Sequence, residues 1–404
     1  MSELAATVTS PDGAAEAPRA WSRRVLSATF TGLGAKLGLA WIMVVAFCGV
    51  AAPLLANTYP LAMKSGGVVS FPAIRYLNWA DVTLLAGTVV SLILFFAARG
   101  LAVPTRLAFI VGIYGVLAVV TFLTVRAPQL QGFEQYRGME ASGEIDWSVY
   151  APIRFSATDR LRDQPFDAEA RTHPWPPSNT HLMGTEVNGS DILSRMIHAC
   201  RIAMSLGFIS TGLSLFIGVL AGAVMGYYVK WIDLIGMRIM EVFDAIPTLF
   251  LMLAAVAFFG RNLYIIMLII GFTGWVGIAR FVRAEFLKLR NVDYVLAAQA
   301  LGLPLRSILF RHLLPNALAP VLVQVSFGVA SAILAESSLS FLGLGLIDEP
   351  SWGAMLNQAV GATGGFQWWL AIFPGAAIFL TVLSYNLIGE ALRDSLDPKL
   401  LKRE

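Results

Sequence analysis

A series of uncharged, apolar runs constrains this chain more than any other feature of its sequence. A helix needs about 20 residues to cross the roughly 30 Å hydrocarbon core of a bilayer, and each run is close to that length. Hydrophobic residues form 57% of the 404 residues and charged residues only 14%, unlike a soluble domain. The runs lie near residues 37–56, 80–98, 107–125, 202–228, 242–259, 262–281, 317–335 and 368–389.

These runs predict an all-α integral membrane protein, a polytopic helical bundle of about eight spans. Hydrocarbon offers no water to backbone N–H and C=O groups, so a spanning segment satisfies them within a helix or a closed barrel. The roughly ten-residue alternation typical of barrel strands is absent, so the runs are expected to be helices. Pro247 and Pro374 fall inside two runs and should kink them.

The distribution of Lys and Arg predicts which ends of the spans face the cytoplasm. Short cytoplasmic loops are enriched in basic residues. If the N-terminus is cytoplasmic, the basic residues between Arg280 and Arg311 and those of the C-terminal tail also lie inside. The loops at 57–79 and 337–367 then face outward and hold few basic residues. Both termini are therefore expected in the cytoplasm.

Motifs for nucleotide or metal chemistry are absent from the sequence. No glycine–lysine pair occurs, so the phosphate-binding loop GxxxxGK[ST] is missing and the chain is not expected to bind ATP in that manner. The histidines are scattered without ligand-like spacing, and Cys48 and Cys200 form no CxxC pair. We therefore expect no cofactor and no metal bound by this chain, and no enzyme activity of its own.

The cytoplasmic loop between the sixth and seventh runs is the most informative segment. We expect two short helices there: Asp293 can cap the first, and Gly302 can end it in a left-handed conformation. Pro304 and Ser307 suit the start of the second helix, and Pro315 opens the next span. An amphipathic helix of this kind fits either the lipid surface or a groove on a soluble protein.

This loop resembles the Glu-Ala-Ala motif of ABC importer permeases, whose coupling helix docks on the nucleotide-binding subunit. Leu296 stands at the Glu position of the motif. The sequence Arg311-His312-Leu313-Leu314-Pro315-Asn316 resembles the oligopeptide, dipeptide and nickel branch. The residues that the resemblance assigns to the ATPase-docking loop are Ala297, Ala298, Gly302, Arg306, Arg311, His312, Leu314 and Pro315.

Further motifs extend the resemblance over residues 181–398. They are Met183–Glu186, Gly189–Arg195, Ile333–Gly345, Pro350–Gly353 and Leu392–Pro398, with Glu186 and Ser190 as departures from the family pattern. They resemble the second, C-type membrane subunit of that branch. The segments Tyr150–Phe155 and Pro176–Ser178 resemble the long-loop permeases of microcin C-type peptide importers.

The resemblance implies that the chain has five segments. They are a cytoplasmic N-terminal tail (1–36), a three-span region with the first common span plus two extra (37–126), an extracytoplasmic loop with an interfacial helix (127–200), a permease core with five spans and a coupling loop at 282–316 (201–391), and a cytoplasmic C-terminal tail (392–404). The extracytoplasmic loop is either a small structured cap or a tethered irregular loop.

The resemblance implies a permease subunit in the bacterial cytoplasmic (inner) membrane that forms half of a translocation path for peptides. Its implied partners are a homologous second permease subunit, two ABC ATPase subunits that use ATP and Mg, an extracytoplasmic substrate-binding protein and the lipid bilayer, with no nucleic acid. Nickel or another small solute is an alternative cargo. An ion-coupled secondary transporter is the alternative of a different class.

Polar residues inside the apolar runs are candidates for the translocation path or for helix packing. They are Asp244, Gln324, Glu336 and Asn386. Acidic residues inside a membrane span are candidates for a functional role. The two acids lie near span ends, however, where a structural role is favoured.

Overall fold

The computed structural model describes residues 28–97, 103–128, 132–161, 174–346, 349–361 and 365–396. Most of the predicted terminal tails lies outside these residues. The long helices are α2 (Leu33–Leu55), α4 (Trp79–Ala97), α5 (Val103–Thr124), α7 (Ile192–Tyr228), α8 (Lys230–Ala245), α9 (Thr248–Phe259), α10 (Leu263–Leu289), α13 (Leu314–Leu339) and α15 (Trp368–Leu396). Shorter helices are α3 (Pro72–Arg75), α6 (Phe133–Ala141), α11 (Asp293–Ala300), α12 (Leu305–Ser307), η2 (Ile308–Leu313), η3 (Ser340–Leu344) and α14 (Trp352–Gly361).

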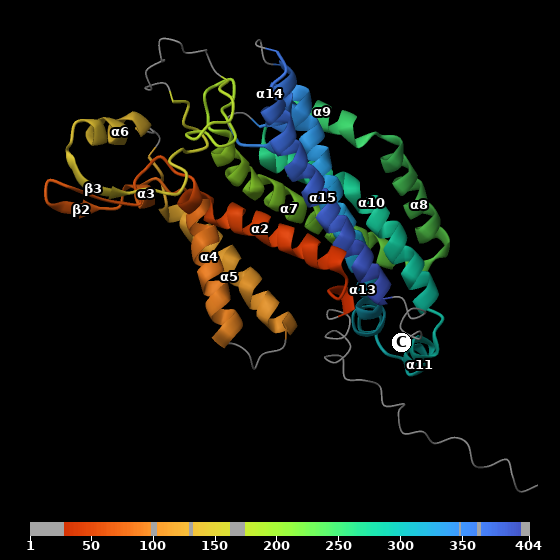
Figure 1. Ribbon diagram of the computed structural model, residues 1–404. Coiled ribbons are helices and arrows are strands. Elements are labelled where there is room, and N and C mark those ends of the chain that lie inside the picture. The colour runs from red at the N-terminus through yellow and green to blue at the C-terminus, as the bar shows by residue number, and fades with distance from the viewer. Residues whose placement is uncertain are drawn as a thin grey trace, which may run out of the picture.

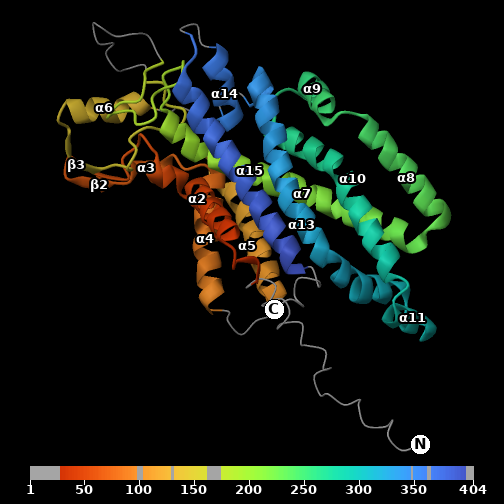
Figure 2. The same ribbon diagram turned by 45° about the vertical axis from the view of Figure 1, so that its right-hand side comes forward.

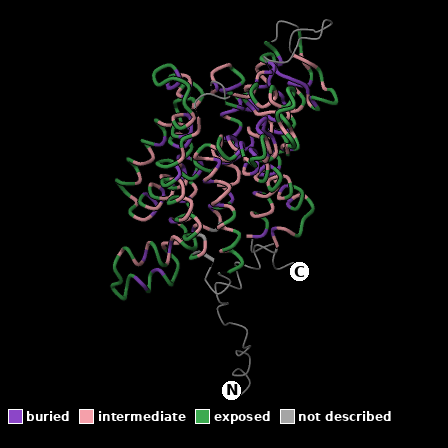
Figure 3. The backbone as a smooth tube through the Cα atoms, turned by 90° about the vertical axis from the view of Figure 1, so that its left-hand side faces the viewer, coloured by how far each residue is buried: buried purple, intermediate pink, exposed green. Residues whose placement is uncertain are grey.

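The long helices form one bundle with two distinct ends (Figures 1 and 2). The helices α6, α9 and α14 lie at one end, and α11 lies at the other, which is the end at which α2 begins and α15 ends. Buried residues gather inside the bundle, whereas many outward-facing turns are exposed (Figure 3). Exposed apolar side chains such as Val111, Phe122 and Trp231 are those expected on a surface that faces lipid.

The number of spans differs from the prediction of about eight. Among the described residues, six helices are long and apolar enough to cross a membrane, or there are seven spans if α8 and α9 count as one. These two helices meet at 71°, because Ile246 and Pro247 are extended and Pro247 starts α9. The predicted kink at Pro247 is thus a complete break. The helix α5 covers the predicted run at 107–125, and its apolar part is too short for the same length test.

Helices α7 and α10 pack closely along a stripe of small residues. A Cβ atom at Gly222 would lie 2.5 Å from the carbonyl oxygen of Ala279, and one at Gly226 would lie 2.6 Å from Cβ of Phe286. Only glycine permits this approach of two backbones. Asp191 caps α7 by accepting the Ser194 N–H at 2.8 Å. The helix then continues unbroken past residue 200, where the prediction separated an interfacial helix from the core.

A small cap joins two segments that are far apart in the sequence. Strands β2 (Val68–Ser70), β1 (Ala62–Ser65) and β3 (Ile145–Val149) form an antiparallel sheet in that order. Asp159 ties the two segments together, because it accepts a hydrogen bond from Thr58 at 2.8 Å and pairs with Arg137 at 2.6 Å. The fold is therefore mostly helical as predicted, with a small sheet that the sequence did not suggest.

The two additional helices α4 and α5 form a hairpin beside α2 (Figures 1 and 2). The hydroxyls of Thr83 and Thr121 lie 2.6 Å apart between them, and the Tyr114 ring covers Gly87. Asn78 and Asp81 start α4 with a reciprocal capping box, each side chain accepting the other's backbone N–H at 2.8–2.9 Å. Asp81 also pairs with Arg201 of α7 at 2.6 Å, which anchors the hairpin to the bundle.

Candidate functional site

The loop between α10 and α13 turns at Gly302, whose φ is +69°. The Gly302 N–H donates to the carbonyl of Gln299 at 2.9 Å, and the Leu303 N–H donates to that of Ala298 at 3.1 Å. These two bonds form a Schellman motif, which needs a left-handed residue at the position of Gly302. The predicted end of α11 is confirmed. Open space surrounds a Cβ built on Gly302, so backbone conformation and not crowding selects glycine within this chain.

The start of the loop and its second helix differ from the prediction. Asp293 is the first residue of α11 and makes no capping hydrogen bond, because Val292 occupies the cap position. The second helix is not separate: α12 continues through the π-helical turn η2 into α13. Pro315 lies directly after the π-helical turn, where its missing N–H leaves one hydrogen bond of the continuous helix unmade.

One side of the loop packs on the bundle and the other side is exposed. Val295, Ala298 and Ile308 are buried in a cluster with Phe286 of α10 and Leu313. On the exposed side, Leu301 is 79% exposed, and Leu296 and Phe310 are about half exposed. Large apolar side chains that are exposed on a loop are typical of a protein-binding surface.

The predicted docking residues divide between these two sides. Ala298 is buried, whereas Ala297, Gly302, Arg306, Arg311 and Pro315 are exposed, and His312 and Leu314 are half-buried. Ala298 therefore supports the loop from inside. We name the exposed apolar set of Leu296, Leu301 and Phe310 the loop face.

A cavity of about 370 Å³, which we call the central cavity, lies midway along α7, α10 and α13, beside the start of α9. Its polar lining residues are Ser210, Thr211, Ser214, Thr248, Thr273, Gln324 and Ser331. None of the residues that line it is charged. Ser210 and Ser214 also donate to the backbone carbonyls of Met267 and Gly271 in α10. A second cavity, of about 460 Å³, shares Gln324 and Phe327 with the first and reaches Arg393.

Of the four polar candidates for the path, the structure places only Gln324 in this cavity. Asp244 is exposed and pairs with Arg280 of α10. Glu336 is buried and accepts hydrogen bonds from Ser340 and Ser351 at 2.6 and 2.7 Å. Asn386 of α15 is half-buried and does not line the cavity. The hydroxyl residues of the cavity were not predicted, because single Ser and Thr residues are ordinary in membrane helices.

The outer signature Met183–Arg195 folds into a buried polar network. Glu186 pairs with Arg195 at 2.6 Å and accepts a hydrogen bond from Gln358 at 3.0 Å. The His181 ring lies 2.9 Å from the carboxylate of Asp191. These contacts tie the start of α7 to α14, so the network positions the core helices.

Comparison with known proteins identifies what this arrangement is similar to. A family described as "Binding-protein-dependent transport system inner membrane component" matches residues 218–402. The inner membrane ABC transporter permease protein YejE of Escherichia coli is 42% identical over 257 residues, 62% of this chain and 72% of that protein.

Two further relatives are similar at the same level. The dipeptide transport system permease protein DppC of Bacillus subtilis is 40% identical, over 56% of this chain and 71% of that protein. The oligopeptide transport system permease protein OppC of Haemophilus influenzae is 41% identical, over 54% of this chain and 70% of that protein.

Proposed function

This chain belongs to the family of inner-membrane permeases of binding-protein-dependent ABC importers, and we propose that it forms one half of a translocation path for peptides. It is a multi-pass membrane subunit and not the ATPase. Its system works with an ATPase and a binding protein. The proposed assembly has a homologous second permease, two ATPase subunits that use ATP and Mg, and an extracytoplasmic binding protein.

The loop face is the observation that carries this proposal. It lies at the end of the bundle opposite the cap, which is the end at which α2 begins and α15 ends (Figure 1). Leu296, Leu301 and Phe310 are exposed there on a loop whose other side is fixed by buried contacts. A partner bound to this face would move α10 and α13 together, since the loop joins both helices. In the proposed orientation this end and both termini are cytoplasmic.

The central cavity supports the proposed path. Its hydroxyl and amide groups can hydrogen-bond the amide groups of a peptide backbone. Because no charged side chain lines the cavity, neither the ammonium nor the carboxylate end of a peptide would be held there by an ion pair. Gln324 lies where the two cavities meet, so it would contact cargo that moves from one to the other.

The proposed cargo is an oligopeptide or a dipeptide. The names of DppC and OppC support a peptide permease, and the two long-loop motifs make a microcin C-like peptide one member of the proposed class. Nickel or another small solute remains the alternative cargo. Competition by each of these solutes for uptake of a labelled dipeptide separates the alternatives.

Substitution of Gly302 tests the docking loop. Gly302→Arg strains the left-handed turn and places a charged side chain beside the loop face, so we expect the ATPase to be lost on purification and ATP-driven peptide uptake to fall at least tenfold. Gly302→Asn should retain most uptake, because asparagine tolerates a positive φ.

An exposed glycine in the cap provides the matched control. Gly138 of α6 also has open space around its Cβ position, so Gly138→Arg should leave ATPase binding and uptake intact. If Gly302→Arg retains both the ATPase and full uptake, the assignment of the loop is wrong.

A further inference from the structure

The small sheet of the cap has one covered face and one open face. Ser70 and Ser148 lie opposite Met63 in the two neighbouring strands, so these three residues share one face. Met63 is only 4% exposed. Tyr150, two residues beyond Ser148, donates a hydrogen bond to Glu140 of α6 at 3.0 Å. Because side chains two residues apart in a strand point the same way, this is the face that α6 covers.

The opposite face of the sheet is apolar around a single lysine. Val69 and Trp147 lie opposite Lys64 in the two neighbouring strands, and Val149 lies on the same side as Trp147. These two valines and the tryptophan are each 44–52% exposed. Phe71, two residues after Val69, is also exposed. We name the set of Lys64, Val69, Phe71, Trp147 and Val149 the sheet face.

This distribution is the reverse of that in a sheet with one face in water. Such a sheet turns its apolar residues toward the core and its polar residues outward. Here two serines flank Met63 on the covered side, whereas valine and tryptophan flank Lys64 on the open side. An exposed apolar face rimmed by polar residues indicates contact with a membrane or with another protein.

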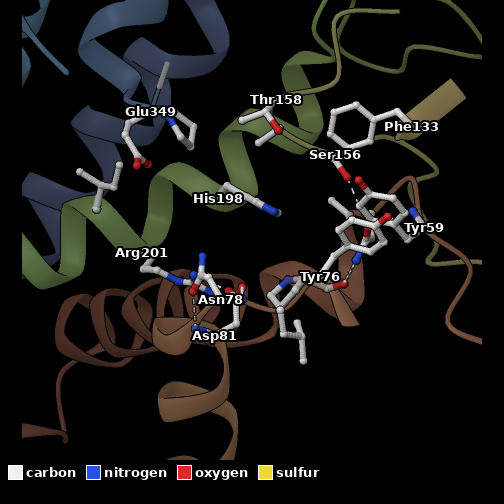
Figure 4. A pocket seen from close by; sticks show the side chains of 17 residues that line it. Tyr59, Tyr76, Asn78, Asp81, Phe133, Ser156, Thr158, His198, Arg201 and Glu349 are labelled. Carbon is white, nitrogen blue, oxygen red and sulfur yellow. Dashed lines mark hydrogen bonds and ion pairs between the residues drawn. The ribbon is translucent and has the colours of Figure 1, made fainter. Parts of the chain in front are cut away.

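Contacts at the base of the sheet hold it beside the start of α4. Tyr59, three residues before β1, stacks on Tyr76, three residues before α4, with ring centroids 3.8 Å apart (Figure 4). The Ala73 N–H of α3 donates to the carbonyl of Pro60 at 3.0 Å. The sheet therefore has a fixed place relative to the point at which the chain enters α4.

That point lies at the edge of a lipid-facing surface. Helix α4 is long and apolar enough to span a membrane. Its first residue, Trp79, packs edge-on against Phe122 near the end of α5, with ring centroids 5.6 Å apart. Phe122 and Leu123 are exposed, so the apolar surface of the hairpin continues up to this end. Tryptophan is enriched where membrane helices meet the water boundary.

The sheet face is turned toward the side on which the hairpin crosses the membrane. In Figures 1 and 2, α6 lies on one side of the sheet, and α4 and α5 run away from the other side. Because α6 covers the face of Met63, the sheet face is the one on the side of the hairpin. The sheet also extends sideways from the hairpin, away from the bundle. The sheet face is therefore continuous with the lipid-facing surface of α4 and α5.

We propose that the sheet face rests on the bilayer surface beside the α4–α5 hairpin, in the outer leaflet of the proposed orientation. Its valine and aromatic side chains would lie among the headgroups and the upper acyl chains, a depth that tryptophan prefers. Lys64 would lay its methylene stem along Val69 and Trp147 and place its ammonium group on lipid phosphates. The cap thereby anchors the outer end of the hairpin. This proposal depends neither on the proposed cargo nor on the loop face.

Fluorescence quenching in the assembled transporter tests this contact. A fluorescent amino acid replaces Val69, and the transporter is placed without its binding protein in phosphatidylglycerol nanodiscs, with or without bromine on the upper acyl chains. Brominated lipid should lower the fluorescence at Val69 by roughly twofold or more, and iodide in the buffer should quench it weakly. Val68 is the matched control, because it is exposed on the same strand and points to the opposite face. A fluorophore at Val68 should respond to iodide and little to brominated lipid.

Variants of Lys64 test the contact with phosphate. Lys64→Glu sets a carboxylate against the lipid phosphates, so quenching of Val69 by brominated lipid should fall by about half or more, and Lys64→Arg should retain it. Full quenching in Lys64→Glu would overturn the phosphate contact.

Three results at Val69 would overturn the whole proposal. The first is quenching by iodide as strong as at Val68, and the second is equal quenching of both positions by brominated lipid. The third is shielding of Val69 from iodide only after the binding protein is added, which would make the sheet face a protein-docking surface.

Discussion

Glu336 illustrates how a buried acid in a membrane helix can serve packing. Its carboxylate accepts the hydroxyls of Ser340 and Ser351, which links the end of α13 to the residue before α14. A Cβ atom at Gly353 would lie 2.4 Å from the carbonyl of Ser337, so α14 approaches α13 without room for a side chain. Glu336 therefore fastens two helices at a point of close contact.

Two substitutions at Glu336 separate hydrogen bonding from charge. Glu336→Leu leaves both serine hydroxyls without their acceptor, and we expect the free energy of unfolding to fall by about 2 kcal/mol. Glu336→Gln keeps an acceptor oxygen and should cost less than half of that. Thermal unfolding of the purified chain in detergent measures the difference. Equal destabilisation by Gln and Leu would mean that the charge, and not the hydrogen bonds, holds the two helices.

Residue-scale predictions from the sequence succeeded where local chemistry decides the conformation. Gly302 was predicted to end a helix because a left-handed cap favours glycine, and its φ of +69° agrees. Asp293 was wrongly predicted to cap α11, since the helix begins one residue earlier than the cap rule required. The ion pair between Asp81 and Arg201 could not be predicted, because nothing in the sequence relates two positions so far apart.

At the scale of elements, the contact between α7 and α10 organises the core. Gly218, Gly222 and Gly226 lie four residues apart on one face of α7, and each meets the α10 backbone or a Cβ atom within 3 Å of its own Cβ position. The serines Ser210 and Ser214 continue this face and donate to α10 carbonyls. Close packing and interhelical hydrogen bonds together hold the two helices.

A valine at Gly222 should separate α7 from α10. Its Cβ would lie 2.5 Å from the Ala279 carbonyl, and backbone cannot yield as a flexible side chain can. We expect Gly222→Val to lower the free energy of unfolding by about 3 kcal/mol and to reduce the yield of folded protein. Gly212→Val is the control on the same helix, because no atom lies within 4 Å of that Cβ position. Similar melting temperatures for the two variants would contradict this packing.

The sequence predicted elements best where an apolar run is long and unbroken. The run at 242–259 predicted a span that begins too late in the sequence, because α8 already begins at Lys230. Charged residues in α8 interrupt its apolar sequence, although one face of the helix is apolar. Asp233 and Asp244 pair with Arg283 and Arg280 of α10, so the charges of α8 are matched in the folded chain. The sheet of the cap was missed for another reason. Its strands are short, and β1 pairs with β3 across roughly 80 residues, a distance that local periodicity does not register. Strands β1 and β2 form a local hairpin around Gly66 and Gly67, a two-glycine turn that the sequence does signal.

At the scale of the whole molecule, the two ends of the bundle differ. The loop face lies at one end, and the cap with its small sheet lies at the other (Figures 1 and 2). Helices α7, α10 and α13 connect the two ends and line the central cavity. The family motifs predicted the loop and the core, but they do not cover the α4–α5 hairpin or the small sheet of the cap.

Photo-crosslinking at Leu301 tests the central claim, that the loop face docks the ATPase. A photoreactive benzoylphenylalanine is placed at Leu301, which is 79% exposed, or at the control Leu182, which is 63% exposed and directly precedes the signature Met183–Arg195. Irradiation of the assembled transporter should join the residue at Leu301 to an ABC ATPase, identified by mass spectrometry, and the residue at Leu182 should not. An ATPase adduct from Leu182, or none from Leu301, would contradict the account.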